Sequence, residues 1–260
     1  MILPLSFRKY GRCHLPPQQS KGDMPFDKPR IHHVMLGHHE RVSQVFGGVT
    51  KRTQSQAEEF ASSISHGIGL IATLAGTPIL TVQAVKQGDA GIVVAMSLFS
   101  ASMIILYLAS TLYHALPVGK AKRVFRIIEH SAIHLLIAGT YTPFTLGVLR
   151  GAWGWSLFVA VWSLAVIGIL LKATGREANP FLSASLYLLM GWLVIVAIQP
   201  MLEKVPAEGL LLICAGGLSY TIGVLFFALD SKLKYGHLIW HLFVLAGTAF
   251  HYFAILWYAR

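Results

Sequence analysis

The stretch AGIVVAMSLFSASMIILYLASTLYHALPVG, residues 90–119, contains no Asp, Glu, Lys or Arg. An α-helix rises 1.5 Å per residue, so about 20 apolar residues cross the roughly 30 Å hydrocarbon core of a bilayer. A helix in a soluble core rarely runs this far without a charge, and a transmembrane barrel would show alternating segments of about ten residues. The stretch therefore predicts a membrane-spanning helix.

Six further uncharged windows, each at least 20 residues long, occupy residues 61–85, 130–149, 151–171, 178–202, 209–229 and 235–259. Only 12% of the chain is charged, against roughly a quarter in soluble domains, and its mean hydropathy is +0.61. We predict an all-α, multi-pass membrane protein of the inner or plasma membrane. Its seven transmembrane helices are expected to form one domain over residues 57–260.

The basic residues are distributed unevenly between the predicted loops. The segment before the first span holds nine Lys or Arg, the loops after the second, fourth and sixth spans hold eight, and the other loops and the C-terminal end hold four. The positive-inside rule then predicts a cytoplasmic N-terminus and an external C-terminus. Because the net charge of +10 is a topology signal, we expect membrane lipids and no nucleic acid among the partners.

Residues 1–56 are basic and rich in Pro, Gly and His, which predicts a poorly ordered cytoplasmic tail. The apolar run at the N-terminus is too short for a signal peptide, so the first span is expected to direct insertion. Cys13 lies in this tail and Cys214 in the sixth span. The two cysteines therefore predict no disulfide framework.

Histidines at membrane depth are costly, so they indicate a partner or a function. In the predicted topology, His114 lies near the inner end of the second span with Ser110 one turn before it, and Glu129 begins the third span. His237 and His241 share one face at the start of the seventh span. All five groups should lie at one depth near the cytoplasmic leaflet, and Glu129 is expected to be the only carboxylate close enough to matter.

Three imidazoles with one open position are the arrangement of a catalytic zinc site, where the metal lowers the pKa of a bound water to roughly 7. We predict His114, His237 and His241 as the zinc ligands. Glu129 could orient or deprotonate the water, and Ser110 could hydrogen-bond the water or a substrate oxygen. The alternative is that these histidines are hydrogen-bonded packing residues.

The remaining histidines of the spans are weaker candidates. His66 enters the first span at a depth from which it could contact the ligands, and His130 and His134 form a competing pair one turn apart beside Glu129. His251 lies ten residues beyond the nearest predicted ligand, about 15 Å along the helix axis, so it cannot share the metal. Hydrogen bonding between helices is the alternative role for all four.

Five segments of the chain resemble the haemolysin III family: EEFASSISHGIG (58–69), LASTLYHA (108–115), EHSAIHLLIAGTYTPF (129–144), LYLLMGW (186–192) and HLIWHLFVLAGTAFHYFAI (237–255). This family belongs with the progestin and adipoQ receptors and, more distantly, with the alkaline ceramidases. The resemblance covers about residues 57–258. It implies a seven-helix fold with a cytoplasmic N-terminus.

The resemblance also implies roles for individual residues. In receptor members the zinc ligands are the histidine of an S-x-x-x-H motif and both histidines of an H-x-x-x-H motif, which match the three predicted ligands. The family usually has Asp at Glu129, Tyr at His134 and Asn at Ser62. These differences leave the three histidines in place and change the groups around them.

Three functions from different classes are compatible with these features. The first is zinc-dependent hydrolysis of an amide or ester bond in a lipid-like substrate. The second is a non-enzymatic receptor-like or membrane-homeostasis role with structural zinc. The third is cytolysis, which the family name suggests but which fits poorly, because seven spans with positive-inside loops are typical of a resident membrane protein. The sequence predicts neither the substrate nor the oligomeric state.

Overall fold

The structure is a computed structural model that describes residues 52–175 and 180–259, all within the compact unit Lys51–Arg260. In these residues it is helical and contains no strand, which confirms the all-α prediction. The helices are α2 (Gln56–Lys86), α3 (Ala90–Ala115), α4 (Lys120–Leu146), α5 (Ala152–Ala173), α6 (Pro180–Gly191), η1 (Trp192–Ala197), α7 (Ile198–Lys204), α8 (Ala207–Ala228) and α9 (Gly236–Tyr258). The predicted tail falls almost entirely outside the described residues.

Six helical segments are long and apolar enough to cross a membrane: α2, α3, α5, α8, α9 and the combined segment Phe181–Lys204. The prediction of a multi-pass integral membrane protein is therefore confirmed. The remaining predicted span, the third, corresponds to α4, which is as long as the others but less apolar. Its hydropathy is lowered by groups such as Glu129 and His134, and both of these side chains are buried within the protein.

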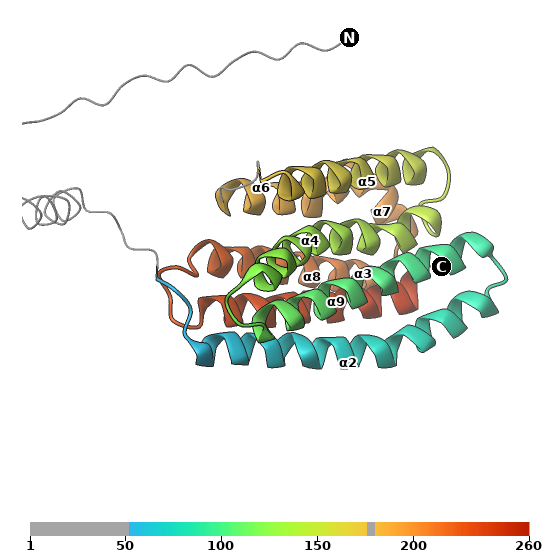
Figure 1. Ribbon diagram of the computed structural model, residues 1–260. Coiled ribbons are helices and arrows are strands. Elements are labelled where there is room, and N and C mark those ends of the chain that lie inside the picture. The colour runs from blue at the N-terminus through green and yellow to red at the C-terminus, as the bar shows by residue number, and fades with distance from the viewer. Residues whose placement is uncertain (1–51, 176–179, 260) are drawn as a thin grey trace, which may run out of the picture. The chain divides into compact units, whose positions relative to one another are not determined.

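The position of α4 explains why it tolerates polar groups. Short connections make successive helices run antiparallel, and α4 packs against α3, α5, α6 and α9 (Figure 1). A helix covered by protein on several sides can point polar side chains at its neighbours instead of at lipid. The most polar of the long helices is thus also one that packs against four other elements.

The fifth predicted span is helical but interrupted, because the 3-10 segment η1 separates α6 from α7. Pro200 has no N–H to donate to the carbonyl of Val196, so regular α-helical bonding cannot continue through this region. The Tyr141 hydroxyl of α4 donates to the Gly191 carbonyl at 2.7 Å and accepts the N–H of Val194 at 2.9 Å. These bonds tie the interruption to the neighbouring helix.

The start of α2 is fixed by a capping box in which Ser55 and Glu58 bond each other's backbone N–H. The Glu58 carboxylate also accepts hydrogen bonds from both terminal nitrogens of Arg52, at 2.8 and 2.5 Å, and from the backbone N–H of Tyr235, at 2.7 Å. Tyr235 has a left-handed backbone, with φ of 59°, and immediately precedes α9. Glu58 therefore joins the start of α2 to the start of α9, and its hydrogen bond raises the pKa of Arg52.

Candidate metal centre

Four side chains predicted from the sequence meet at the end of the bundle where α2, α4 and α9 begin and α3 ends. They are His114, Glu129, His237 and His241, and one possible ligand atom from each lies within 4.8 Å of all the others. All four residues are buried, the most exposed at 7%. The consecutive helices α3 and α4 and the distant helix α9 thus supply one compact cluster.

The two histidines of α9 share a face because they are one helical turn apart. Their ring centroids are 4.7 Å apart, and each lies 4.9 Å from the ring of His114 on α3. The three imidazoles therefore form a triangle with nearly equal sides. This is the arrangement that the predicted topology required.

The outer nitrogen of His114 is held by an acidic residue of α2. Its Nδ1–H donates to Oε2 of Glu59 at 2.8 Å, and Lys122 of α4 lies 3.0 Å from the same oxygen. With Nδ1 protonated, Nε2 of the neutral ring carries a lone pair that faces the cluster. An acceptor behind an imidazole is the usual way in which proteins orient a histidine ligand.

Both histidines of α9 also have an oxygen behind Nδ1. His241 donates from Nδ1 to the carbonyl of Ser62 at 3.2 Å, with the hydroxyl of Ser65 at the same distance. For His237 the neighbour is Oδ2 of Asp230, in the turn before α9, at 3.4 Å. Each of the three imidazoles therefore has an acceptor near its outer nitrogen.

Glu129 is held by a chain of two hydrogen bonds. The Ser110 hydroxyl donates to Glu129 Oε1 at 2.6 Å, and Ser110 accepts a bond of 2.6 Å from Nδ1–H of His66. The same carboxylate oxygen lies 3.5 Å from His114 Nε2 and 3.9 Å from His241 Nε2. His66 also stacks on His241, with ring centroids 3.6 Å apart, so it contacts two members of the site.

The site residues fit a metal ion because their inward-facing atoms lack partners. Nε2 of His114, His237 and His241 and Oε2 of Glu129 are buried and hydrogen-bond to nothing in the described part of the chain. Buried polar atoms without partners are costly, and a carboxylate more so than an imidazole. A divalent cation bound by these four residues would satisfy all of these atoms at once. Imidazole nitrogen and carboxylate oxygen are suitable ligands for several transition metals.

The competing pair on α4 lies beside this cluster but is held differently. Nδ1–H of His130 donates to the carbonyl of Arg126 in its own helix at 2.7 Å. His134 packs against Gly168 of α5, where a Cβ would overlap the imidazole, and against the ring of Tyr187 at 4.8 Å. The two rings of this pair therefore face different surroundings.

His251 lies further along α9, away from the cluster. Its Nε2–H donates to the carbonyl of Ile213 on α8 at 3.1 Å, and its ring packs against Gly216 of the same helix. The bond is an interhelical contact of the kind that the alternative role predicted.

The expectation that Glu129 would be the only relevant carboxylate is wrong. Glu58 is 2% exposed and joins two helices, Glu59 holds His114, and Asp230 lies behind His237. The sequence contains a signal for them, because all three lie within a few residues of a predicted span boundary at the same end of the bundle. Their orientation toward the site depends on helix rotation and on the path of the turn before α9.

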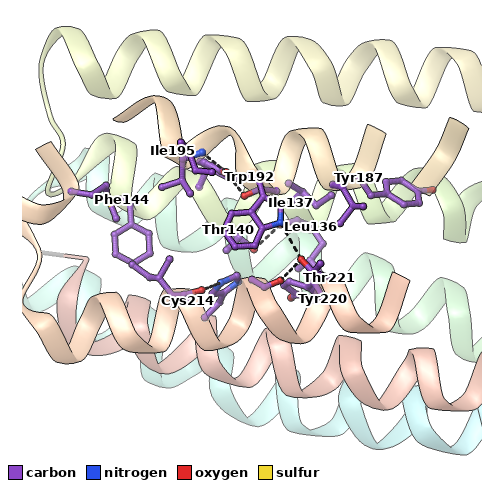
Figure 2. Close-up of a pocket in the computed structure, with 18 of the residues that line it drawn as sticks. Leu136, Ile137, Thr140, Phe144, Tyr187, Trp192, Ile195, Cys214, Tyr220 and Thr221 are labelled. Atoms are coloured by element: carbon purple, nitrogen blue, oxygen red, sulfur yellow. Dashed lines mark hydrogen bonds between the residues drawn. The ribbon is translucent and has the colours of Figure 1, made fainter. Parts of the chain in front are cut away.

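One cavity adjoins the cluster, and a second cavity shares part of its lining. The first, a small cavity of about 10 Å³, room for about one water molecule, is lined by Glu129, His130 and His237 among others. The second, a larger apolar cavity of about 300 Å³, lies between α4, α6, η1, α8 and α9 (Figure 2). Four residues line both: Leu106, Ile133, Trp240 and Val244. These four side chains therefore lie between the small cavity and the large apolar one.

Residues 54–252 match the family model described as Haemolysin-III related, which spans most of the chain. The chain belongs to the haemolysin III family. It is 47% identical over 210 residues to Hemolysin-3 of Bacillus cereus, covering 81% of this chain and 95% of that protein. It is 43% identical over 201 residues to the Hemolysin-3 homolog of Bacillus subtilis strain 168, covering 77% and 94%.

A more distant haemolysin III relative is human. The chain is 26% identical over 207 residues to the Monocyte to macrophage differentiation factor of Homo sapiens, covering 76% of this chain and 83% of that protein. This match extends the similarity to a wider superfamily, as the resemblance implied. No solved structure is significantly similar to the chain.

Proposed function

We propose that this haemolysin III protein is a zinc-dependent membrane hydrolase that cleaves an amide or ester bond in a lipid-like substrate. The observation that carries the proposal is the convergence of three imidazole nitrogens and a carboxylate oxygen beside an apolar cavity. Catalytic zinc sites in hydrolases combine three protein ligands with one exchangeable position. The cluster supplies the ligands, and the cavity supplies room for an aliphatic chain.

In this proposal His114, His237 and His241 hold zinc through Nε2. When bound, zinc polarises a carbonyl group and makes water more acidic at neutral pH. Glu59 accepts a hydrogen bond from the outer nitrogen of His114, and the Asp230 carboxylate lies 3.4 Å from the outer nitrogen of His237, which keeps the inner nitrogens available. The described residues therefore provide both the ligands and the groups that orient them.

Glu129 is proposed as the general base. Its Oε2 has no partner, so this oxygen can take a proton from the water that attacks the carbonyl carbon. The same carboxyl group can then donate that proton to the departing nitrogen or oxygen. Ser110 holds Oε1 beside the imidazoles and is itself held by His66, which fixes the carboxylate and leaves Oε2 without a hydrogen bond in the described part of the chain.

The larger cavity is proposed to bind the lipid chain. Its wall is mostly apolar, and its volume of about 300 Å³ is at the lower end of the range for small-molecule sites. The distribution of basic residues supports a location of the metal centre near the cytoplasmic leaflet, with the N-terminus in the cytoplasm. A substrate could then keep its chain at membrane depth while its polar bond reaches Glu129.

The test combines elemental analysis with an activity assay on the full-length protein in detergent. The substrates are a chromogenic anilide and a chromogenic ester of hexadecanoic acid. We expect near-stoichiometric zinc and hydrolysis of at least one substrate. Glu129→Gln should keep the zinc and lower the rate about 10²- to 10⁴-fold, because it removes the base. A wild-type protein that binds zinc but hydrolyses neither substrate would count against the hydrolase.

The second candidate is a receptor-like or membrane-homeostasis protein with structural zinc. It is favoured by the number of possible metal ligands in the cluster. Glu129 could act as a fourth ligand, which would leave no coordination position for water or substrate. In that case Glu129→Gln would lose zinc, and the wild type would show no turnover. The name Hemolysin-3 attaches cytolysis to the Bacillus cereus relative. Dye release from liposomes that contain the purified protein would test that third role.

A further inference from the structure

Trp240 lies at the boundary between the metal cluster and the apolar cavity. It precedes His241 on α9, is only 5% exposed, and is one of the four residues that line both cavities. A ligand held between the two cavities could therefore contact this side chain.

The indole ring is oriented by helix α8. A Cβ at Gly223 would lie 2.8 Å from Cε3 and 3.1 Å from Cζ3, so this edge of the ring packs directly on the α8 backbone. Phe227 of the same helix lies 5.5 Å from the ring. The pyrrole nitrogen occupies the opposite edge of the indole, so the N–H is directed away from Gly223.

The N–H of Trp240 donates to no group in the described residues. Trp240 lines both cavities, so there is space beside the ring for an acceptor group of a ligand. Buried tryptophan N–H groups normally find an acceptor. Trp192, on the wall of the same apolar cavity, donates to the hydroxyl of Thr221 at 3.0 Å (Figure 2).

We propose that Trp240 is a substrate-binding residue that donates its N–H to the acyl carbonyl oxygen of a long-chain ligand at the junction of the two cavities. The indole N–H can only donate, so it selects an acceptor such as a carbonyl group. The aliphatic chain occupies the apolar cavity, and the carbonyl lies beside Glu129 and His237 in the small one. This inference rests on the proposed function and names the group of the substrate that is recognised.

The test measures binding without turnover. The probes are heptadecanone, a methyl ketone that cannot be hydrolysed, and heptadecane, which has the same chain length but no acceptor. Both compete with a radiolabelled long-chain fatty acid on full-length, metal-loaded protein in detergent. One net hydrogen bond predicts about two- to ten-fold tighter binding of the ketone. Replacing Trp240 with benzothienylalanine, which exchanges N–H for sulfur at similar size, should remove the preference and leave heptadecane binding unchanged.

The same replacement at Trp192 is the matched control, because its N–H is already bonded to Thr221. That variant should keep the preference for the ketone. Equal binding of both probes by the wild type would overturn the proposal, since a ligand that gains nothing from a carbonyl does not use the N–H. A preference that survives the change at Trp240 would overturn it too and would assign recognition to the metal. Because neither probe is cleaved, a failure of hydrolysis leaves this result interpretable.

Discussion

The protein contains two pairs of histidines one turn apart, and they differ in what they contact. Nε2 of both His237 and His241 points toward a third imidazole and a carboxylate, and an oxygen lies behind each outer nitrogen. In the other pair, His130 bonds its own helix and His134 packs against α5 and a tyrosine of α6. Spacing determines which side chains share a helix face, but the residues on neighbouring helices determine what that face can bind.

The largest expected effect is the loss of metal from the first pair. Replacing His237 and His241 together with Ala should reduce bound metal from near one equivalent to below about a tenth, because two of three imidazole ligands are removed. The matched variant replaces His130 and His134 with Ala and should keep its metal. Elemental analysis on the monodisperse fraction of each purified protein measures both. Equal losses in the two variants would contradict the distinction between the pairs.

The next largest effect is expected at Glu59, which accepts the hydrogen bond from the proposed ligand His114. Glu59→Gln removes the charge that holds Nδ1–H of His114, so metal affinity should fall about 10- to 100-fold while the protein remains folded. Competition with a chelator of known affinity gives the value. Glu203→Gln is the control, because Glu203 is exposed on α7 and, among the described residues, accepts a hydrogen bond from a glutamine of the same helix. An unchanged affinity in Glu59→Gln would show that His114 needs no orientation from α2.

The second pair is tested through the helix that packs on it. In Gly168→Ala the new Cβ would overlap the His134 imidazole and push α4 and α5 apart, which should destabilise the protein by about 1–3 kcal/mol. The melting temperature should fall while the metal content stays constant. Gly217→Ala is the control, because a Cβ there meets nothing within 4 Å. If Gly168→Ala lost metal, the two pairs would be coupled.

The smallest effect is expected at the opposite end of the bundle, where Asp89 caps α3 and pairs with Arg150 at 2.5 Å. Hydrogen bonding to Arg150 lowers the pKa of Asp89, so the carboxylate stabilises the fold fully above its unfolded pKa of about 3.9. This contribution is lost as the pH falls through the folded pKa.

Asp89→Asn should therefore lower the melting temperature slightly at pH 7 and not at all at acidic pH. The effect is small because the pair is exposed and Asn still caps a helix. Melting curves at both pH values test this prediction. A larger loss at low pH would contradict the sign, and a change in metal content would link this end of the bundle to the centre.

Much of the fold could be predicted from the sequence, because the cost of burying charge in lipid leaves long uncharged windows. Each window coincides with a helix or, for the fifth, with α6, η1 and α7 together. Hydropathy alone underestimates α4, since Glu129 and its histidines lower the average although the helix packs among others. The interruption at η1 depends on Pro200 and on Tyr141 of another helix, which no single window contains.

The residues that form the candidate metal centre could also be predicted from the sequence. The topology brings Ser110, His114 and Glu129 to one end of the bundle, together with the first histidines of α9. The groups behind the imidazoles were not predictable, because their contacts depend on helix rotation. Asp230 in particular reaches the site through a turn that ends in the left-handed residue Tyr235, and hydrophobic periodicity carries no information about such a turn.

The chain order of the cluster has a consequence for biosynthesis. His114 and Glu129 are made early, but two of the four cluster residues belong to α9, which follows every other described helix in the sequence. A ribosome must therefore translate past residue 241, and α9 must insert next to α3 and α4, before the four candidate ligands can meet. Metal content would then report completed assembly, since a chain arrested after α8 or any earlier helix holds at most two of the four cluster residues.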